Sequence, residues 1–224
     1  KYLGYDVFRF DKDDDVSNFD FSDSLFITEG RVDEGMPIRD DCFYILHNCP
    51  NRGQKNYINL QVYTVDVIGR INTVELEGNK CQYYNVEGRI YYMPWATDLL
   101  PHEIDVIKQN YDNIYNKKSN VINFVGMMTE PWGIFANIAK EEYIKFSCCG
   151  GFSNNRVSRE KNVELIQQSY IAPTLQDEWQ VRQCYIPCRI FKNISYGKMG
   201  ITNSKFVYEF FDKKIIYNSD LKQL

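Results

Sequence analysis

The sequence predicts an α/β protein with two lobes, each built on a mostly parallel sheet. Three observations lead to this fold class. The 224 residues are enough for two small domains. Short β-branched or aromatic runs alternate with segments of helical periodicity. A polar segment near residue 118 separates two sets of such elements, so we expect lobes at residues 1–118 and 119–224.

The first lobe is expected to hold one sheet followed by a helix. Pro101 opens a segment through residue 115 whose apolar side chains recur at helical spacing, and proline is well tolerated in a first helical turn. Residues 1–7 have the pattern of a helix that ends at a glycine and runs into a strand, so we expect this lobe to lack a preceding strand and helix. The predicted strands are Tyr5–Phe10, Ser24–Thr28, Phe43–His47, Ile58–Val65 and Arg89–Pro94.

The second lobe is expected to begin with the apolar strand Val121–Val125, which ends at Gly126. Ser158 is suited to cap a helix, and Gly197 is suited to stop one. This alternation of strands and helices predicts a mostly parallel sheet with helices on its faces. The remaining predicted elements are helices at 158–169, 187–197 and 205–211 and strands at 170–175 and 199–203.

The composition excludes several classes of protein. Hydrophobic residues at 44% and charged residues at 25% are values of a folded globular chain. The formal charge of −4 removes the broad positive field that non-specific nucleic-acid binding needs. No stretch approaches the ~18–20 apolar residues of a membrane span, and the first residues lack the pattern of a signal peptide. We expect a cytoplasmic protein with no nucleic-acid partner and no membrane span.

The seven cysteines predict reduced thiols rather than disulfides. Their number is odd, and the chain is too long to need disulfide staples. Cys184 and Cys188 are spaced most nearly like zinc ligands, but no second pair of cysteine or histidine residues accompanies them. We therefore expect no metal site.

The charges are distributed unevenly along the chain. Residues 1–50 contain twelve acidic and five basic residues, whereas Trp179–Tyr208 contains five basic residues and no acidic one. A cationic segment in an acidic protein favours a small anionic ligand. The alternative is a solvated basic surface.

Basic residues in this segment point to phosphate. Arg189 and Lys192 fall in the first turns of the helix predicted at 187–197, where backbone N–H groups already favour an anion. An arginine can also clamp two phosphate oxygens at once. Arg156, in the glycine-containing polar loop at 150–156, is a second candidate. Each of these residues alone is more often a surface charge, so the prediction depends on their combination.

A resemblance to a known family adds to this prediction. The segment Tyr185–Asn203 resembles the donor-binding half of a GT-B glycosyltransferase, in which a loop, an arginine-bearing helix, a glycine and a short strand ending in Thr-Asn surround a nucleotide sugar. Asn123–Gly126 and Ser169–Gln176 correspond to the first strand and a later strand of that half. Phe26–Gly30, Tyr44–Asn48 and Trp95–Asp105 are similar to glycosyltransferases of large DNA viruses that infect algae.

This resemblance implies two Rossmann-like lobes of the GT-B type, with an acceptor-side lobe first and a nucleotide-sugar-binding lobe second. It implies a UDP- or GDP-linked donor, a glycan or glycoprotein acceptor and transfer without a metal or other cofactor. Many retaining enzymes of this type have a glutamate where this chain has Lys192 or Asn193. The donor-binding residues that it implies are Gly126, Arg156, Arg189, Lys192 and Asn203.

A transferase also needs a base to deprotonate the acceptor hydroxyl. Glu29 and His47 come at the ends of predicted strands, where open α/β sheets bind ligands, and Asp98 precedes the helix predicted at 101–115. His47 is equally suited to a buried structural position, and Asp98 to a helix cap. Glu29 is the first candidate, because a glutamate between a strand and Gly30 has little structural reason to be there.

Two other functions remain open. Asp13–Asp15 contains the Asp-x-Asp pattern with which GT-A glycosyltransferases hold a divalent metal and a diphosphate, although a solvated loop is the simpler interpretation. The chain could instead bind a carbohydrate or nucleotide without catalysis, stacking Trp95, Trp132 or Trp179 on sugar faces.

Overall fold

A computed structural model describes residues 4–10, 13–29, 36–47, 51, 53–62, 74–76, 79–81, 89–115, 119–150 and 156–224. The chain forms two compact units, which we call unit 1 (Lys1–Met93) and unit 2 (Pro94–Leu224). The division follows Met93, whereas the sequence analysis placed the boundary near residue 118. The helix that begins at Pro101 therefore belongs to unit 2.

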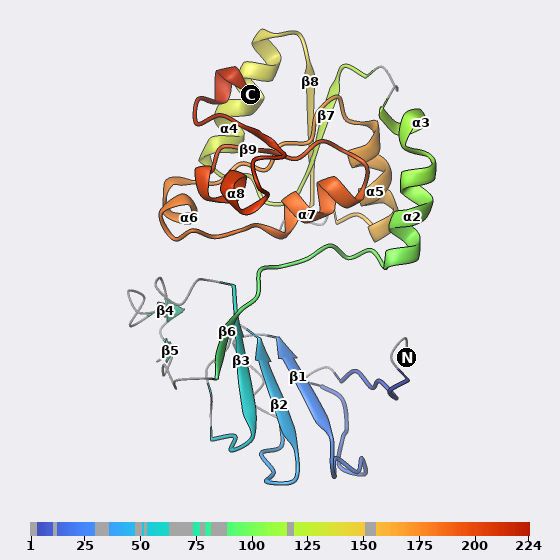
Figure 1. Ribbon diagram of the computed structural model, residues 1–224, viewed down its shortest axis with the longest axis vertical. Helices are drawn as coiled ribbons and strands as arrows, with labels where there is room; N and C mark the ends of the chain where they lie inside the picture. The colour runs from blue at the N-terminus through green and yellow to red at the C-terminus, as the bar shows by residue number, and fades with distance from the viewer. Residues whose placement is uncertain are drawn as a thin grey trace. The chain divides into compact units, whose positions relative to one another are not determined.

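Unit 1 contains a four-stranded sheet in which every neighbouring pair is parallel (Figure 1). Its strands match four of the five predicted runs, and they follow chain order across the sheet as β1-β2-β3-β6. A separate antiparallel pair, β4 and β5, lies in the connection between β3 and β6. The bounds are β1 Leu25–Glu29, β2 Phe43–His47, β3 Tyr57–Gln61, β4 Val74–Leu76, β5 Asn79–Cys81 and β6 Ile90–Tyr92.

One of the five strands predicted for the first lobe, Tyr5–Phe10, is not a strand in the structure, so this prediction was wrong. These residues pair with no strand of the described part of the chain, and Tyr5, Val7 and Phe8 are exposed. The segment is held by side chains instead, because the rings of Phe8 and Phe10 pack edge-on against Phe19. Its apolar and aromatic residues therefore satisfied the pattern of a strand without having a neighbouring strand to bond.

Unit 2 alternates strands and helices along the chain, as the sequence predicted for the second lobe. Helix α2 ends at Gln109, and α3 begins two residues later, so the single helix predicted at 101–115 is in fact two. The bounds are α2 Pro101–Gln109, α3 Tyr111–Tyr115, β7 Val121–Val125, α4 Glu130–Glu141, β8 Lys145–Cys149, α5 Arg159–Gln168, α6 Glu178–Arg182, α7 Cys188–Ser195, β9 Ile201–Thr202, α8 Lys205–Phe210, β10 Ile216–Tyr217 and the 3₁₀ turn η1 Leu221–Gln223.

Local sequence explains where several of these helices begin. Ser158 accepts a hydrogen bond from the backbone N–H of Lys161 at the start of α5, which confirms it as an N-cap. Ser204 caps α8 in the same way. Pro131 occupies the first turn of α4, where its missing N–H costs nothing. No described helix is both long enough and apolar enough to cross a bilayer.

Strand β7 lies in the middle of unit 2. It pairs in parallel with β8 on one side, and on the other side Val121 accepts a hydrogen bond from the N–H of Tyr170 at 2.7 Å. The predicted strand at 170–175 forms only an isolated parallel bridge, between Thr174 and Thr202 of β9, and β9 pairs in parallel with β10. Residues 170–174 thus connect β7 to β9 by hydrogen bonds.

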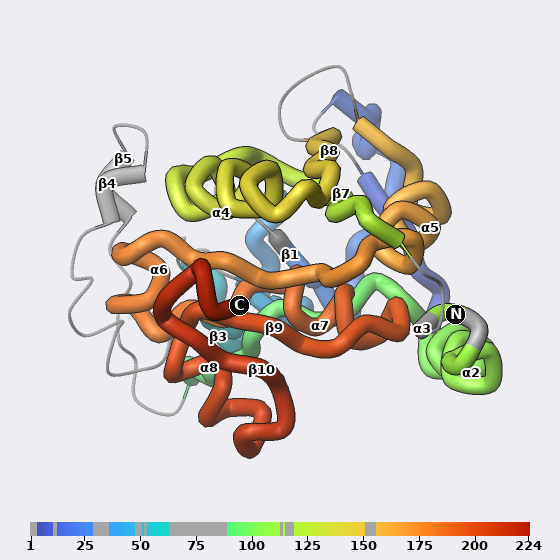
Figure 2. Tube along the Cα trace, turned by 90° about the horizontal axis from the view of Figure 1, so that it is seen from above, coloured from blue at the N-terminus to red at the C-terminus, as the bar shows by residue number. Residues whose placement is uncertain are grey.

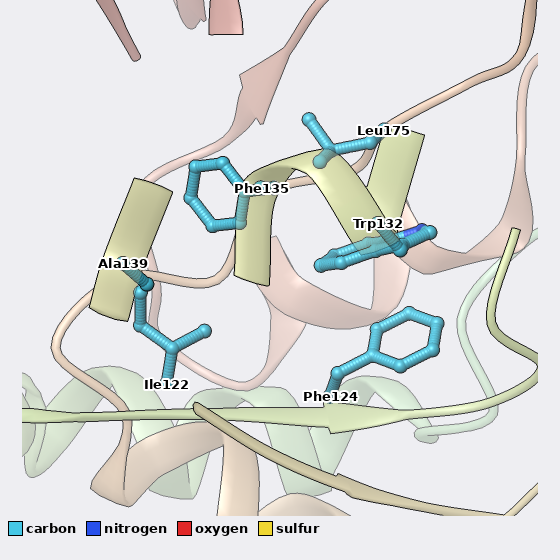
Figure 3. Close-up of a cluster of buried hydrophobic side chains, with 6 residues drawn as sticks. All are labelled: Ile122, Phe124, Trp132, Phe135, Ala139 and Leu175. Atoms are coloured by element: carbon cyan, nitrogen blue, oxygen red, sulfur yellow. The ribbon is translucent and has the colours of Figure 1, made fainter. Parts of the chain in front are cut away.

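Both faces of β7 are covered by helices. Ile122 and Phe124 pack against α4 in a buried cluster that is completed by Trp132, Phe135, Ala139 and Leu175 (Figure 3). Val125, at an odd-numbered position of the strand, packs on the other face with Ile166 of α5 and Tyr196 beside α7. Figure 2 shows α4 and α5 on opposite sides of β7. Unit 2 is therefore a three-layer α/β/α structure, compatible with a Rossmann-like lobe.

Candidate anion-binding site

The chain reverses its direction of travel across the sheet at β7. From β7 it passes through α4 to β8 on one side, and then through α5 to residues 170–174 on the other side. Connections that leave in opposite directions run over opposite faces of the sheet, so they leave a crevice at the carboxyl end of the strand between them. The carboxyl end of β7 is therefore where unit 2 is expected to bind a ligand.

Two glycines follow the two paired strands at this end. Gly126 follows β7, and its N–H donates to the backbone oxygen of Cys149 at 2.8 Å. Gly150 follows β8, and both glycines have positive φ, 151° and 91°. A methyl group on Gly150 would lie 3.1 Å from the nitrogen of Gly126, and one on Gly126 would collide with Nη2 of Arg189. The two glycines let the backbone and Arg189 approach each other closely.

Arg189 is the cation of this site, which we call the β7 site. It lies in the first turn of α7, and its Nη1 donates to the backbone oxygen of Val125, the last residue of β7, at 2.7 Å. The guanidinium lies 4.3 Å from the ring centre of Phe124 and 5.6 Å from that of Trp132. Burial lowers the pKa of Arg189, an effect that the neighbouring Cys188 and Cys148 thiols oppose.

This cation has no carboxylate partner in the part of the chain that the structure describes. The salt bridges found there do not include Arg189, and the sequence around it from Trp179 to Tyr208 contains no acidic residue. A partly buried guanidinium without a counter-ion is costly, and an anion offsets that cost. One guanidinium carries five N–H donors, so the bond to Val125 leaves others for a ligand.

Lys192 is engaged elsewhere. Its Nζ lies 3.0 Å from Oδ2 of Asp98, and the hydroxyl of Tyr196 donates to Oδ1 of the same carboxylate at 2.6 Å. Burial alone would raise the pKa of Asp98, but the hydrogen bonds from Tyr196 and Lys192 outweigh it and keep the pKa below its ordinary value. Burial, and then the bond to Asp98, raise the pKa of Tyr196. Asp98, Lys192 and Tyr196, which we call the Asp98 clamp, fasten the segment before α2 to α7.

Asn203 and Arg156 are two other predicted donor-site residues, and the contacts described for them do not include Arg189. Asn203 makes two hydrogen bonds with the backbone of Gln176, one through its Oδ1 and one through its Nδ2, both at 2.9 Å. It therefore joins the end of β9 to the end of the 170–174 segment. Arg156 is exposed just before α5. The glycine-containing loop before it, residues 151–155, lies outside the described residues.

The three candidate bases fall in two different units. Glu29 and His47 end neighbouring strands of unit 1, and they are direct register partners. His47 is buried, whereas the side chain of Glu29 lies outside the described residues. Asp98 belongs to unit 2. The backbone thus brings two of the three candidates together at the carboxyl end of one parallel sheet.

Several elements and contacts of unit 2 were not predicted from the sequence. Helix α4 and strand β8 were not predicted, although Pro131 followed by Trp132, Phe135 and Ala139 has the spacing of a buried helix face. Tyr196 was read only as part of the α7 sequence, and its bond to Asp98 spans 98 positions, which no local pattern reveals. Gly150 was seen as loop sequence rather than as a neighbour of Gly126.

Two further predictions from the sequence concern a metal site and the state of the cysteines. Asp13, Asp14 and Asp15 are exposed in an irregular segment before β1, and the described residues contain no group of three or more histidine, cysteine, aspartate or glutamate side chains that could hold a metal ion. The cysteines whose side chains the structure describes, Cys42, Cys148, Cys149, Cys184 and Cys188, are free thiols.

The chain matches no protein-family model, no curated protein and no solved structure. The resemblance to GT-B glycosyltransferases therefore stays a prediction from the sequence.

Proposed function

We propose that this chain is a GT-B glycosyltransferase whose unit 2 binds the phosphates of a nucleotide-sugar donor at the β7 site. In this proposal unit 1 is the acceptor-side lobe, and the sugar passes to a glycan or glycoprotein without the help of a metal. The observation that carries the proposal is Arg189, a partly buried cation at the start of α7 without a carboxylate partner among the described residues.

The chemistry of the reaction explains why such a cation is needed. When the glycosidic bond to a nucleoside diphosphate breaks, negative charge develops on the leaving phosphate. The N-terminus of α7 supplies backbone N–H groups, and Arg189 supplies a fixed charge whose position is set by Val125 and by the Phe124 ring. A cation already held in place stabilises this charge without reorganising during the reaction.

The Asp98 clamp revises which residues carry this role. Because Lys192 is paired with Asp98, Arg189 rather than Lys192 is the principal phosphate ligand in the proposal, and Asp98 is a weak candidate for the base. Arg156 is exposed and remains a candidate for a second phosphate contact. Glu29 remains the first candidate for the base, with its register partner His47 as the second.

The donor site is tested by calorimetric titration of the chain with UDP and GDP. We expect one of them to bind. We expect Arg189→Lys to weaken that binding by roughly tenfold or more, because lysine keeps the charge but cannot form a bidentate pair of hydrogen bonds with phosphate. Arg182→Lys is the matched control, since Arg182 is exposed on α6. Arg189 also stacks on Phe124, so thermal unfolding must show that Arg189→Lys is folded. Equal affinity of wild type and Arg189→Lys would remove Arg189 from the site.

Transfer is tested separately, by following nucleotide release from a panel of UDP- and GDP-sugars with glycan acceptors in EDTA. We expect turnover to persist in EDTA and to fall by ~100- to 10,000-fold in Glu29→Gln with donor affinity unchanged. Activity that is lost in EDTA and restored by Mn²⁺ would favour the metal-dependent GT-A alternative with Asp13–Asp15. Nucleotide binding with no transfer to any acceptor would indicate a non-catalytic binding protein.

A further inference from the structure

Helix α4 of unit 2 ends in a turn that favours glycine but contains a tyrosine. The N–H of Tyr143 donates to the backbone oxygen of Lys140 at 3.2 Å. The next N–H, that of Ile144, donates to the backbone oxygen of Ala139 at 2.8 Å. This pair of bonds is the Schellman motif, in which the residue after the C-cap takes a left-handed conformation and is usually glycine. Tyr143 has a φ of 58°, where a Cβ atom is strained.

The fold explains the turn but not the tyrosine. Ile144 packs against the buried cluster that contains Ile122 and Phe124, and β8 begins at Lys145, so the backbone has to reverse at position 143. The side chain of Tyr143 is 93% exposed and belongs to no core cluster of the described residues. Glycine would satisfy the backbone with less strain. A strained residue whose ring supports no packing is a candidate for a function.

The ring of Tyr143 borders a shallow, open hollow on the surface of unit 2. The hollow has a volume of about 500 Å³ and is lined by Asn137, Lys140, Glu141 and Tyr143. The first three residues lie in the second half of α4, three or four positions apart, so their side chains share one face of the helix. We call these four residues the Tyr143 site. Its volume falls in the range of ~300–1,000 Å³ that is typical of small-ligand sites.

The Tyr143 site is separate from the β7 site. Gly126 and Gly150 of the β7 site follow the carboxyl ends of β7 and β8, whereas Tyr143 comes just before the amino end of β8. Strands β7 and β8 are parallel, so the two sites lie at opposite edges of the sheet. A ligand of the Tyr143 site therefore does not compete for Arg189.

The polar side chains of the Tyr143 site are available to a ligand. Asn137, Lys140 and Glu141 are exposed, and within the described ranges their side chains form no hydrogen bond or salt bridge. The amide of Asn137 both donates and accepts, the ammonium of Lys140 donates, and the carboxylate of Glu141 accepts. The two charges are of opposite sign, so the site favours a neutral polar ligand over an anion or a cation.

We propose that the Tyr143 site binds a neutral glycan. A sugar ring has C–H groups on its faces, which can stack on the tyrosine ring, and hydroxyls at its edge, which both donate and accept. An exposed aromatic ring beside unpaired donors and acceptors matches both parts of such a ligand. A standard protein interface takes roughly 20–30 residues on each side, far more than these four. The inference does not depend on the donor site at β7, and it holds whether or not the chain transfers a sugar.

The probe is a set of neutral hexasaccharides of glucose, of mannose, of galactose and of N-acetylglucosamine. Each is tested with the full chain by saturation-transfer difference NMR and then titrated by calorimetry. We expect at least one of them to bind and Tyr143→Ala to weaken its binding at least tenfold. Hexagalacturonate, the anionic counterpart of the galactose hexamer, should bind no more tightly than the neutral glycan. Asp212→Gly is the matched variant, because Asp212 occupies the same left-handed position after α8, and it should leave glycan binding unchanged.

Tyr143→Gly separates a binding role from a structural one. It relieves the backbone, so the midpoint of thermal unfolding should rise by roughly 2–8 °C while the glycan affinity falls at least tenfold. Four results would overturn the proposal. They are no binding of any neutral hexasaccharide, tighter binding of hexagalacturonate, equal glycan binding by wild type and Tyr143→Ala, which would place the glycan elsewhere on the chain, and a lower unfolding midpoint for Tyr143→Gly, which would mean that the ring supports the fold.

Discussion

In unit 1 the strands follow chain order across the sheet, whereas in unit 2 the chain returns past β7 and continues on its other side. Both sheets are built from parallel strands of similar length, and both bury aromatic side chains. The order of the strands alone places helices on both faces of β7, and it predicts the carboxyl end of this strand as the place for a ligand. The strand order β1-β2-β3-β6 of unit 1 contains no such reversal.

The comparison teaches that the two units have different means of binding. Unit 2 offers a fixed cation beside two glycines, which suits a small anion. Unit 1 instead places two candidate bases, Glu29 and His47, side by side at the carboxyl end of its sheet. Their role in the proposed reaction depends on which acceptor unit 1 binds.

The largest expected effect is on stability, and it compares a buried isoleucine of one sheet with an exposed isoleucine of the other. Ile122 of β7 is 1% exposed and Ile27 of β1 is 72% exposed. Ile122→Ala should cost about 2–5 kcal/mol in the free energy of unfolding of unit 2, whereas Ile27→Ala should change stability by less than ~1 kcal/mol. All three tryptophans belong to unit 2, so tryptophan fluorescence in urea follows that unit, and circular dichroism follows both. Equal losses for the two variants would show that Ile27 is buried as deeply as Ile122.

The next effect tests the crevice at β7. Gly126→Ala places a methyl group against Arg189 Nη2 and should lower nucleotide affinity by roughly 10- to 150-fold, the equivalent of one lost charge-assisted hydrogen bond. Gly133→Ala is the control, because a methyl group there contacts nothing within 4 Å and replaces a helical glycine of α4. Gly133→Ala should keep the affinity and gain about 0.5–1 kcal/mol of stability. Calorimetry gives the affinity and urea unfolding the stability.

A smaller effect depends on pH and concerns the Asp98 clamp. Asp98→Asn should destabilise unit 2 by roughly 1–2 kcal/mol at neutral pH, since it weakens the bonds to Lys192 and Tyr196. The folded-state pKa of Asp98 is lowered, so its contribution is present above the unfolded-state pKa of about 3.9 and is lost as the pH falls through the lower folded value.

The wild type and Asp98→Asn should therefore converge in stability in that acid range, as measured by thermal unfolding at a series of pH values. Asp212 is the matched control, because it also pairs with a lysine, Lys214, but its side chain is 80% exposed. Asp212→Asn should differ little from the wild type at any pH. A difference between wild type and Asp98→Asn that persists unchanged at the lowest pH would contradict the assigned ion pair.

The smallest effect concerns the helix caps, which occur in unit 2 among the described residues. Ser158→Ala removes the acceptor for the N–H of Lys161 and should cost about 1 kcal/mol, measured by urea unfolding through tryptophan fluorescence. Ser158→Gly should cost only a few tenths of a kcal/mol, because glycine readily adopts the backbone conformation of a cap. If alanine and glycine cost the same, the hydroxyl of Ser158 does not stabilise α5.

The sequence by itself determined those parts of the protein whose cause is local. Runs such as Phe43–His47 have the composition of strands, Ser158 has the side chain of a cap, and residues 188–195 have helical periodicity, so their structures follow from neighbours in the chain. The sequence also predicted Arg189 and Gly126 as residues of one site, through the cationic segment and through resemblance, and the structure places them next to each other. It was wrong about Tyr5–Phe10, because a strand requires a partner that no local pattern supplies.

Only the tertiary structure decided which side of β7 the chain takes and which charges meet. The bond of Arg189 to Val125 spans 64 positions, and that of Tyr196 to Asp98 spans 98. Such contacts depend on the strand order, which the spacing of apolar residues does not encode, because parallel strands of either order have the same local pattern. For the same physical reason the sequence indicated that unit 1 contains a sheet, but only the structure gave the order of its strands.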